Sequence, residues 1–379
     1  IERAGISFHF RHATGSHKLV LTDDVLAHET IGARPYKSYD GHHQAEGEHF
    51  WDWAPERNLT TGAIRLTDYN FKKPDQAMEV DRLGDAAHAQ GTIECFDWPG
   101  DYLAQDVGKI VAGLRMNQER GGDRRNRAVG DCVSLRVGKR VTLSGDPVPG
   151  TGETYLCLSA NHHFVSEAYG SGGQGSDGYA FTGAYTLMPD TAAMATPRRT
   201  AVPLVHGPQT AMVVGEGEID CDEYGRILVR FHWDLAGAHS MRCRVSQNWA
   251  GAGWGGMVIP RIGMEVVVEF LEGDPDKPLV TGCVYNGKND APYDLPGNKT
   301  RSTFRTSTHG GKGFNELRFE DQQGGEEIYL HGQRDLNVLV NNDRSSIVRG
   351  NHLDKIFGDE IRATNGSRRQ HIAGASEET

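Results

Sequence analysis

The sequence predicts a mainly β protein whose C-terminal part is a rod wound from several copies of the chain. Two observations predict this class: short alternating stretches that recur along the first three hundred residues, and a strict eight-residue repeat over the last forty. Alternation is typical of half-buried strands, and a fixed period is typical of a stacked architecture. The length of 379 residues is enough for two or three domains with cores of their own.

The C-terminal repeat has the form β-branched residue, any residue, then Gly or Asn. The β-branched positions are Val340, Val348, Ile356, Thr364 and Ile372, and the partner positions two residues later are Asn342, Gly350, Gly358, Gly366 and Gly374. An even period keeps each of these side chains on one face of an extended chain. β-branched residues suit a pleated, half-buried surface. Gly and Asn tolerate positive φ, so we expect the chain to turn a corner at each of them.

One apolar position per octad gives a single chain too little core to offset its conformational entropy. A thin stack of strands would also leave long open edges, which natural proteins avoid. We therefore expect several chains to wind together and to share their inward Val and Ile side chains, in a number that the period does not set. The alternative is a polar, disordered tail with accidental glycine spacing, and five matches in register disfavour it.

Composition excludes some classes of function. The formal net charge of −11 disfavours a nucleic-acid binder that relies on phosphate neutralisation. The six cysteines are scattered without a C-x-x-C motif, which predicts buried thiols in a reduced compartment and no disulfide scaffold. No secretory signal and no apolar run long enough to span a bilayer is visible. The chain begins at Ile1 inside a predicted strand, so we expect an N-terminally truncated fragment.

The N-terminal half is predicted to consist of short strands with irregular connections. Gly5–Phe10 and Lys18–Thr22 predict a hairpin, and Leu103–Arg120 predicts a helix with Val107, Ile110, Val111 and Leu114 on its buried face. A second helix is predicted over Gln76–Ala89. Further strands are predicted over Asn58–Asp68, Asn70–Lys72, Val137–Leu143 and Glu153–His163. The four prolines of Met188–Pro208 indicate a linker between domains.

Residues 211 to about 290 carry the clearest alternation in the chain. Five strands are predicted, over Ala211–Ile219, Gly225–Trp233, Met241–Trp249, Glu265–Leu271 and Leu279–Tyr285. Five short strands joined by tight glycine turns suit a small closed barrel of the OB type.

The same region carries motifs that identify a family. They are Tyr224-Gly225-Arg226-Ile227, Trp233-Asp234, Trp249-Ala250-Gly251, Trp254-Gly255, Pro260-Arg261-Ile262-Gly263-Met264-Glu265-Val266, Gly273-Asp274-Pro275-Asp276-Lys277-Pro278 and Gly282-Cys283-Val284-Tyr285-Asn286. In this order they closely resemble the central barrel of the VgrG family, the spike proteins of bacterial type VI secretion. Ser307–Gly311 and Phe314–Asp321 resemble the family's junction between barrel and spike, and Gly5–Asp23 resembles part of its N-terminal hub.

The resemblance implies a fusion of a contractile-phage baseplate hub with a tail spike, assembled as a homotrimer. It implies phage-hub-like β-barrel domains over 1–200, an OB-fold barrel over 201–295, and a neck followed by an intertwined triple-stranded β-helix over 296–379. The implied partners are an Hcp-type tube protein, a PAAR-type tip protein, effectors and, transiently, a target membrane, with no nucleic acid and no cofactor. The implied location is the bacterial cytoplasm before firing, and afterwards the outside or a target cell.

Three polar clusters are candidate metal sites. His42, His43, Glu46, Glu48 and His49 lie close in sequence but form no H-E-x-x-H motif, so a polar loop is expected in place of a metal site. His162 and His163 are adjacent in a strand and face opposite sides. Asp220–Gly225 imitates the start of a calcium loop but has Tyr224 at the third ligand position, so a turn is expected.

Two other classes of function remain as alternatives to a spike. A cell-wall hydrolase resembling a phage tail lysozyme would need a placed carboxylate pair, but Pro292–Thr308, where that domain would be inserted, offers only Asp294. No G-x-S-x-G motif is present either, so we expect no enzyme. An OB-type module that binds oligosaccharide or nucleic acid could use Trp233, Trp249 and Trp254. We expect these tryptophans instead in the core or in contacts between chains.

Overall fold

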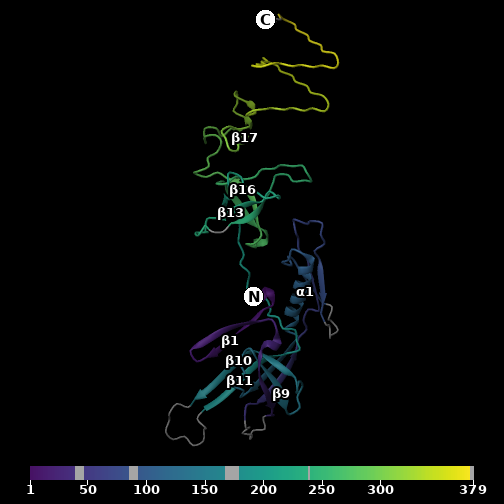
Figure 1. Cartoon of the computed structure of the whole chain (residues 1–379), viewed down its shortest axis with the longest axis vertical. Helices are drawn as coiled ribbons and strands as arrows, with labels where there is room; N and C mark the ends of the chain where they lie inside the picture. The colour runs from purple at the N-terminus through teal and green to yellow at the C-terminus, as the bar shows by residue number, and fades with distance from the viewer. Residues whose placement is uncertain (39–46, 85–92, 167–178, 238–239, 376–379) are drawn as a thin grey trace. The chain divides into compact units, whose positions relative to one another are not determined.

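The structure is a computed structural model that describes residues 1–38, 47–84, 93–166, 179–237 and 240–375. The chain divides into two compact units, Ile1–Val202 and Pro203–Thr379. Strands dominate both units, which confirms the predicted fold class (Figure 1). No helix among the described residues is long and apolar enough to cross a membrane.

A closed barrel forms the body of the first unit. Its strands, in the order in which they pair, are β10 (Thr154–Ser166), β11 (Tyr179–Pro189), β8 (Arg124–Gly130), β4 (Phe50–Arg57), β3 (Glu29–Tyr36) and β9 (Lys139–Gly145). Alternate side chains face inward, so that Val141 and Leu143 of β9 are fully buried while their neighbours are partly exposed. Phe50, Trp53, Tyr155 and several aliphatic residues complete this core. The strands predicted around 137–143 and 153–163 are therefore confirmed as β9 and β10.

The N-terminal hairpin is also confirmed. β1 (Ser7–Ala13) pairs with β2 (Ser16–Thr22) from Ser7 opposite Thr22 to Ala13 opposite Ser16. Two short 3-10 turns flank it, at Glu2–Ala4 and Val25–Ala27. In the second turn the carboxylate of Asp24 accepts from Leu26 N at 2.8 Å, which caps the turn.

A small sheet covered by one helix makes a separate core in the first unit. The central strand β5 (Ala63–Leu66) pairs with β6 (Val80–Leu83) and β7 (Glu94–Asp97), and α1 (Gln105–Arg120) packs against it. The extent of α1 agrees with the prediction, and its buried face agrees in part, because Val111 packs against the core as predicted. Gly108, Ala112 and Met116 face the core, whereas Val107 and Ile110 are exposed.

Gly108 lies on the buried side of α1, where Tyr102 approaches the helix closely. A Cβ on Gly108 would lie 2.6 Å from the Tyr102 ring, so only a residue without a side chain fits there. The Tyr102 hydroxyl donates to the carbonyl of Leu66 at 3.1 Å and to that of Met78, which ties the ring to the sheet below.

Two other predictions for this region are wrong. Residues 76–79 are not helical, and β6 replaces the helix predicted over Gln76–Ala89, whose last five residues lie outside the described part. Met78 and Val80 are both buried, so the apolar period is two and fits a strand pairing beside β5. Asn70–Lys72, predicted as a strand, contributes to a turn. The longer predicted strand Asn58–Asp68 is reduced to β5.

The second unit begins with another closed barrel. Its strands pair in the order β12 (Gln209–Val214), β13 (Ile227–Phe231), β14 (Met241–Val245), β16 (Pro278–Val284) and β15 (Glu265–Phe270), and β15 returns to β12. A short 3-10 turn at Leu271–Gly273 follows β15. Only β14 and β16 run parallel. All five predicted strands are present, and alternating residues such as Val213, Val229 and Val266 fill the core.

A three-stranded antiparallel sheet follows the second barrel. It consists of β17 (Arg301–Arg305), β18 (Glu316–Glu320) and β19 (Glu327–His331). The carboxylate of Glu316, which is only 3% exposed, accepts from the Tyr293 hydroxyl at 2.5 Å and from Thr303 Oγ1 at 2.8 Å. Burial alone raises the pKa of Glu316, but these hydrogen bonds outweigh it and lower that pKa. This buried carboxylate therefore joins the segment before β17 to the sheet.

Candidate functional site in the C-terminal repeat

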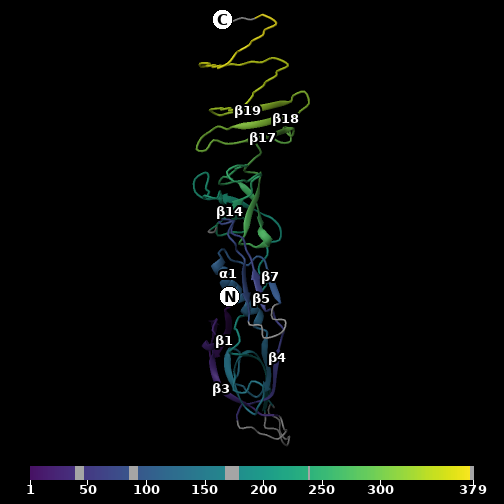
Figure 2. The same cartoon turned by 90° about the vertical axis from the view of Figure 1, so that its right-hand side faces the viewer.

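The C-terminal repeat is as regular in structure as in sequence. Bends occur at residue pairs 341–342, 349–350, 357–358, 365–366 and 373–374, so each of these five bends ends on the Asn or Gly of an octad. Between the bends the chain forms no strand in the part described after His331. Figures 1 and 2 show this segment, in yellow, running back and forth in even steps. The period of the sequence is therefore the period of the backbone.

The β-branched positions of the repeat differ in exposure from their apolar neighbours. Val340, Val348, Ile356 and Ile372 are 45–52% exposed in the single chain. Leu339 and Ile347, each directly before one of these positions, are both 89% exposed. Adjacent residues of an extended chain point in opposite directions, so the β-branched side chains share one side of the repeat.

The single chain does not build a core from these residues. Every described residue from 332 to 375 is exposed, including Thr364 and Asn342. The repeat thus presents a row of apolar side chains to solvent. An exposed apolar surface of this kind typically marks an interaction site.

The glycines of the repeat do not have the conformation expected of them. None of Gly350, Gly358, Gly366 and Gly374 has φ in the positive region that favours glycine, although each lies at a bend. A Cβ placed on any of the four would meet no atom of the same chain within 4 Å. Neither the backbone conformation nor the packing of the single chain therefore requires glycine at these positions.

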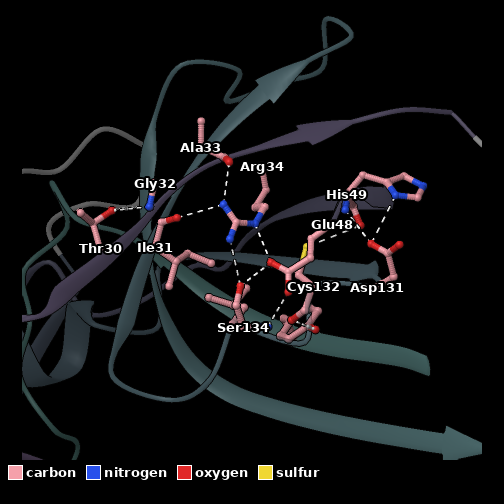
Figure 3. A network of polar contacts seen from close by, with 12 residues as sticks. Thr30, Ile31, Gly32, Ala33, Arg34, Glu48, His49, Asp131, Cys132 and Ser134 are labelled. Atoms are coloured by element: carbon pink, nitrogen blue, oxygen red, sulfur yellow. Dashed lines mark hydrogen bonds and ion pairs between the residues drawn. The ribbon is translucent and has the colours of Figure 1, made fainter. Parts of the chain in front are cut away.

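The first candidate metal cluster is in part a structural network on the first barrel (Figure 3). Glu48 Oε2 accepts from Arg34 Nε at 2.7 Å, and Glu48 Oε1 accepts from Ser134 N at 2.7 Å. The Ser134 hydroxyl also donates to Glu48. Burial raises the pKa of Glu48, but the hydrogen bonds from Ser134 and Arg34 outweigh it and hold that pKa below its usual range. Glu48 therefore joins three segments of the barrel.

The rest of that cluster gives no metal site in the described residues. His49 lies beside Asp131, whose Oδ1 accepts from His49 N at 2.6 Å and lies 3.3 Å from His49 Nδ1. His42, His43 and Glu46 lie outside the described residues. Within the described ranges, no group of three or more His, Cys, Asp or Glu side chains is arranged to hold a metal ion.

The other two polar clusters have the structures predicted for them. His162 Nε2 lies 3.0 Å from the carbonyl of Leu135, while its neighbour His163 is exposed. At the start of the second barrel, Asp222 closes a turn by accepting from Tyr224 N, Arg226 N and Arg226 Nε at 2.7–3.1 Å. Both oxygens of this carboxylate accept hydrogen bonds from the turn, whereas in a calcium loop they would bind the ion.

The tryptophans of the second barrel lie outside its core. Trp233, Trp249 and Trp254 are 57–68% exposed, so the prediction that they fill the core is wrong, and contact between chains stays a prediction. Trp233 stacks on Phe231 with ring centroids 5.2 Å apart and donates to Gln209 at 2.9 Å. Trp249 and Trp254 meet edge to face at 4.8 Å.

The six cysteines are all free, but only three are buried. Cys132, Cys157 and Cys243 are buried, whereas Cys221 and Cys283 are exposed. Burial raises the pKa of Cys157 and of Cys243 to about 12, so these thiols stay protonated and unreactive near neutral pH. The prediction of a chain without disulfides holds, while the prediction that its thiols are buried holds for half of them.

Three families of known domains cover most of the chain. The phage tail baseplate hub (GPD) family matches residues 1–168. The type VI secretion system/phage-baseplate injector OB domain matches residues 209–285, which contain the second barrel. The bacteriophage T4 gp5 C-terminal trimerisation domain matches residues 302–379, which contain the repeat.

Curated relatives match this chain over most of its length. The type VI secretion system spike protein VgrG1a of Pseudomonas aeruginosa is 40% identical over 365 residues, a match that covers 91% of this chain and 55% of the relative. This chain is similar to the VgrG spike proteins along most of its length. VgrG1b of the same organism is 38% identical, and the match covers 91% of this chain and 48% of the relative. The chain thus spans about half the length of the VgrG relatives it matches.

Among solved structures, one match is the E. coli c3393 protein, described as a component of the type VI secretion system. It matches with a TM-score of 0.46 and 15% identity, covering 75% of this chain and 58% of that one.

Proposed function

We propose that this chain forms part of the homotrimeric spike of a bacterial type VI secretion system. In this role it caps the tail tube, punctures a target membrane and delivers effectors, so its work is mechanical. The observation that carries the proposal is the row of half-exposed Val and Ile side chains at every eighth position, which the single chain leaves without a core. The match of residues 302–379 to a trimerisation domain supports three chains.

The proposed rod core consists of the β-branched row facing a common axis. Three chains related by rotation would bring the three copies of Val348 together, and likewise those of Val340, Ile356, Thr364 and Ile372. The glycines two residues later would then lie where neighbouring backbones approach closely, since nothing in their own chain explains them. Charged residues such as Arg344, Asp359 and Arg368 are exposed and would keep the outside of the rod soluble.

We propose a separate role for each barrel and for the repeat. Residues 1–200 form the hub-like part, 201–295 the OB-fold barrel, and 296–379 the neck and the start of the intertwined β-helix. The hub would rest on a ring of an Hcp-type tube protein. A PAAR-type tip protein and effectors would bind beyond the rod. The chain would be held in the bacterial cytoplasm until firing and then pass to the outside or into a target cell. The names of the relatives, which are spike proteins, support this assignment.

Mass in solution tests the proposal directly. Light scattering of residues 1–379 should give three times the 41.6 kDa of one chain. A second chain that ends at Lys299 lacks the neck sheet and the repeat, and its mass shows whether those segments drive assembly. If the shortened chain stays trimeric, the barrels are sufficient for assembly and the repeat only adds to it. A monomeric full chain would refute the intertwined rod.

A further inference from the structure

The first unit contains a cavity of about 390 Å³ that none of the functions above uses. It lies between β1, β8, β10, β11 and the segment 194–199, and β1, β10 and β11 can be followed in Figure 1. Its floor is buried: His9, His28, Cys157 and Met188 are each between 1% and 6% exposed. Phe8 and Arg199 are exposed and lie at its mouth. The volume falls within the range of about 300–1,000 Å³ typical of pockets that bind small molecules.

The charge of the lining is opposite to that of the protein. The lining includes His9, His28, Arg125 and Arg199 but neither Asp nor Glu, although acidic residues outnumber Lys and Arg by 51 to 40 in the sequence. In the described part of the chain, neither guanidinium is paired with a carboxylate: Arg125 Nη1 donates to the carbonyl of Arg124 at 2.9 Å. The carboxylate of Glu2 accepts from the backbone of Arg199, and not from its side chain. Burial, and then the charge of Arg199, lower the pKa of Arg125.

Two polar atoms of the lining are buried without a hydrogen-bond partner. His28 Nδ1 donates to the carbonyl of Gly138 at 3.1 Å, which leaves His28 Nε2 without a partner. Ser7 Oγ is the second such atom. A buried polar atom left unpaired costs about 1–3 kcal/mol, so a group that reaches such an atom from the cavity and pairs with it is favoured. The Ser7 hydroxyl lacks an acceptor, and a ligand oxygen that enters the cavity would supply it.

The remaining lining is apolar and sets the shape of the ligand. Leu156, Leu158, Met188 and Met194 line the cavity together with the four cationic or imidazole side chains. Methionine adapts to irregular shapes and is frequent at surfaces that accept varied apolar groups.

We propose that this cavity binds a small organic carboxylate with an apolar body. The carboxylate is held by the guanidinium groups of Arg125 and Arg199, with the Ser7 hydroxyl as a further hydrogen-bond donor. The hydrocarbon body packs against the leucines and methionines. Planar guanidinium groups match a carboxylate well, and in a cavity without acidic residues no internal anion competes for them.

Calorimetric titration of the chain of residues 1–379 with octanoate tests the proposal. Octanoate should bind with one site per chain, while acetate, which lacks the apolar body, and octanol, which lacks the charge, should each bind at least about tenfold more weakly. Arg199→Gln at the exposed mouth and Arg125→Gln in β8 should each weaken octanoate binding by about tenfold or more. Arg136→Gln is the matched control, because Arg136 is exposed and next in sequence to a lining residue but does not line the cavity.

The outcomes separate cleanly. Absence of octanoate binding up to about 10 mM would overturn the proposal. Equal binding of octanoate and octanol would reduce the cavity to an apolar pocket and overturn the anion site. Equal weakening by Arg136→Gln would show a general charge effect on the surface. Because Arg125 is partly buried in a barrel strand, the melting curve of each variant is recorded first, and Arg199→Gln alone decides the question if Arg125→Gln fails to fold.

Discussion

Replacing Val348 with Asp should break the proposed rod. Val348 is 51% exposed in the single chain, so partner chains can cover this exposed half of its surface. Complete burial of a valine side chain contributes about 1.5–3 kcal/mol, so covering the exposed half contributes about 1 kcal/mol per chain and about 3 kcal/mol per trimer. The substitution also places three carboxylates near one axis, where desolvation costs several kcal/mol more.

The matched control is the preceding residue. Ile347 is 89% exposed and points to the opposite side of the extended chain, so Ile347→Asp should change the stability of the trimer by less than about 0.5 kcal/mol. Light scattering gives the mass of each variant, and thermal unfolding gives its stability. The pH adds a second readout for Val348→Asp. Carboxyl groups crowded in the trimer have a raised pKa, so they bind protons more tightly there than in the free chain, and acid should favour reassembly.

Two results would refute this reasoning. If Val348→Asp remains fully trimeric with an unchanged melting curve, the row of β-branched residues does not form a shared core. If Ile347→Asp is as disruptive as Val348→Asp, the two sides of the repeat are equivalent and the difference in exposure between them has no meaning for assembly.

Three further predictions concern glycine, charge and pH. Gly350→Leu should weaken the trimer and leave the barrels intact, whereas Asn351→Leu should leave the trimer unchanged. Light scattering and melting curves of both variants test this. If the two variants behave alike, neighbouring backbones do not approach closely at Gly350. Arg34→Met should lower the free energy of unfolding in urea by about 1–3 kcal/mol, because it leaves Glu48 without its charged donor. Adding Glu48→Gln should recover part of that loss, and a purely additive double variant would contradict the network. Burial lowers the pKa of His9 and His28, so the unfolded chain binds protons more readily than the folded one. The stability of the first unit should therefore be complete above pH 6.5 and decline as the pH falls from there toward 5. Calorimetry of the unfolding transition of this unit measures the decline, and His9→Gln should reduce it.

The sequence predicted most reliably where a pattern is strictly local. The period of eight placed every bend of the C-terminal segment, and clean alternation placed all five strands of the second barrel. Both patterns depend on side-chain direction along an extended chain, which is the same in any tertiary context. The reason given for the glycines was wrong, because bending at these positions does not use positive φ.

Where tertiary contacts decide, the sequence was a weaker guide. The apolar stripe of α1 predicted its buried face only in part. Val111 packs against the core, but Val107 and Ile110 are exposed, and Gly108 lies on the buried side, where Tyr102 approaches it closely. The network of Arg34, Glu48 and Ser134 joins residues up to a hundred positions apart, and no local motif marks it. The cavity of His9 and His28 likewise forms only when distant strands meet. Such sites form because strand pairing brings distant residues together, and no spacing in the sequence predicts them.

The spacing of the bends has a consequence for how such a spike can change its length. Each repeat contributes one bend. In the proposed rod each repeat would also contribute one inward side chain, and the next repeat would begin in the same orientation. Removing residues 351–358 would join equivalent points of two repeats and leave everything downstream in register. Removing seven of those eight would turn each later inward side chain to the outside. The length of the proposed rod would therefore change by whole octads, because any other deletion would shift the later bends or turn the later side chains outward.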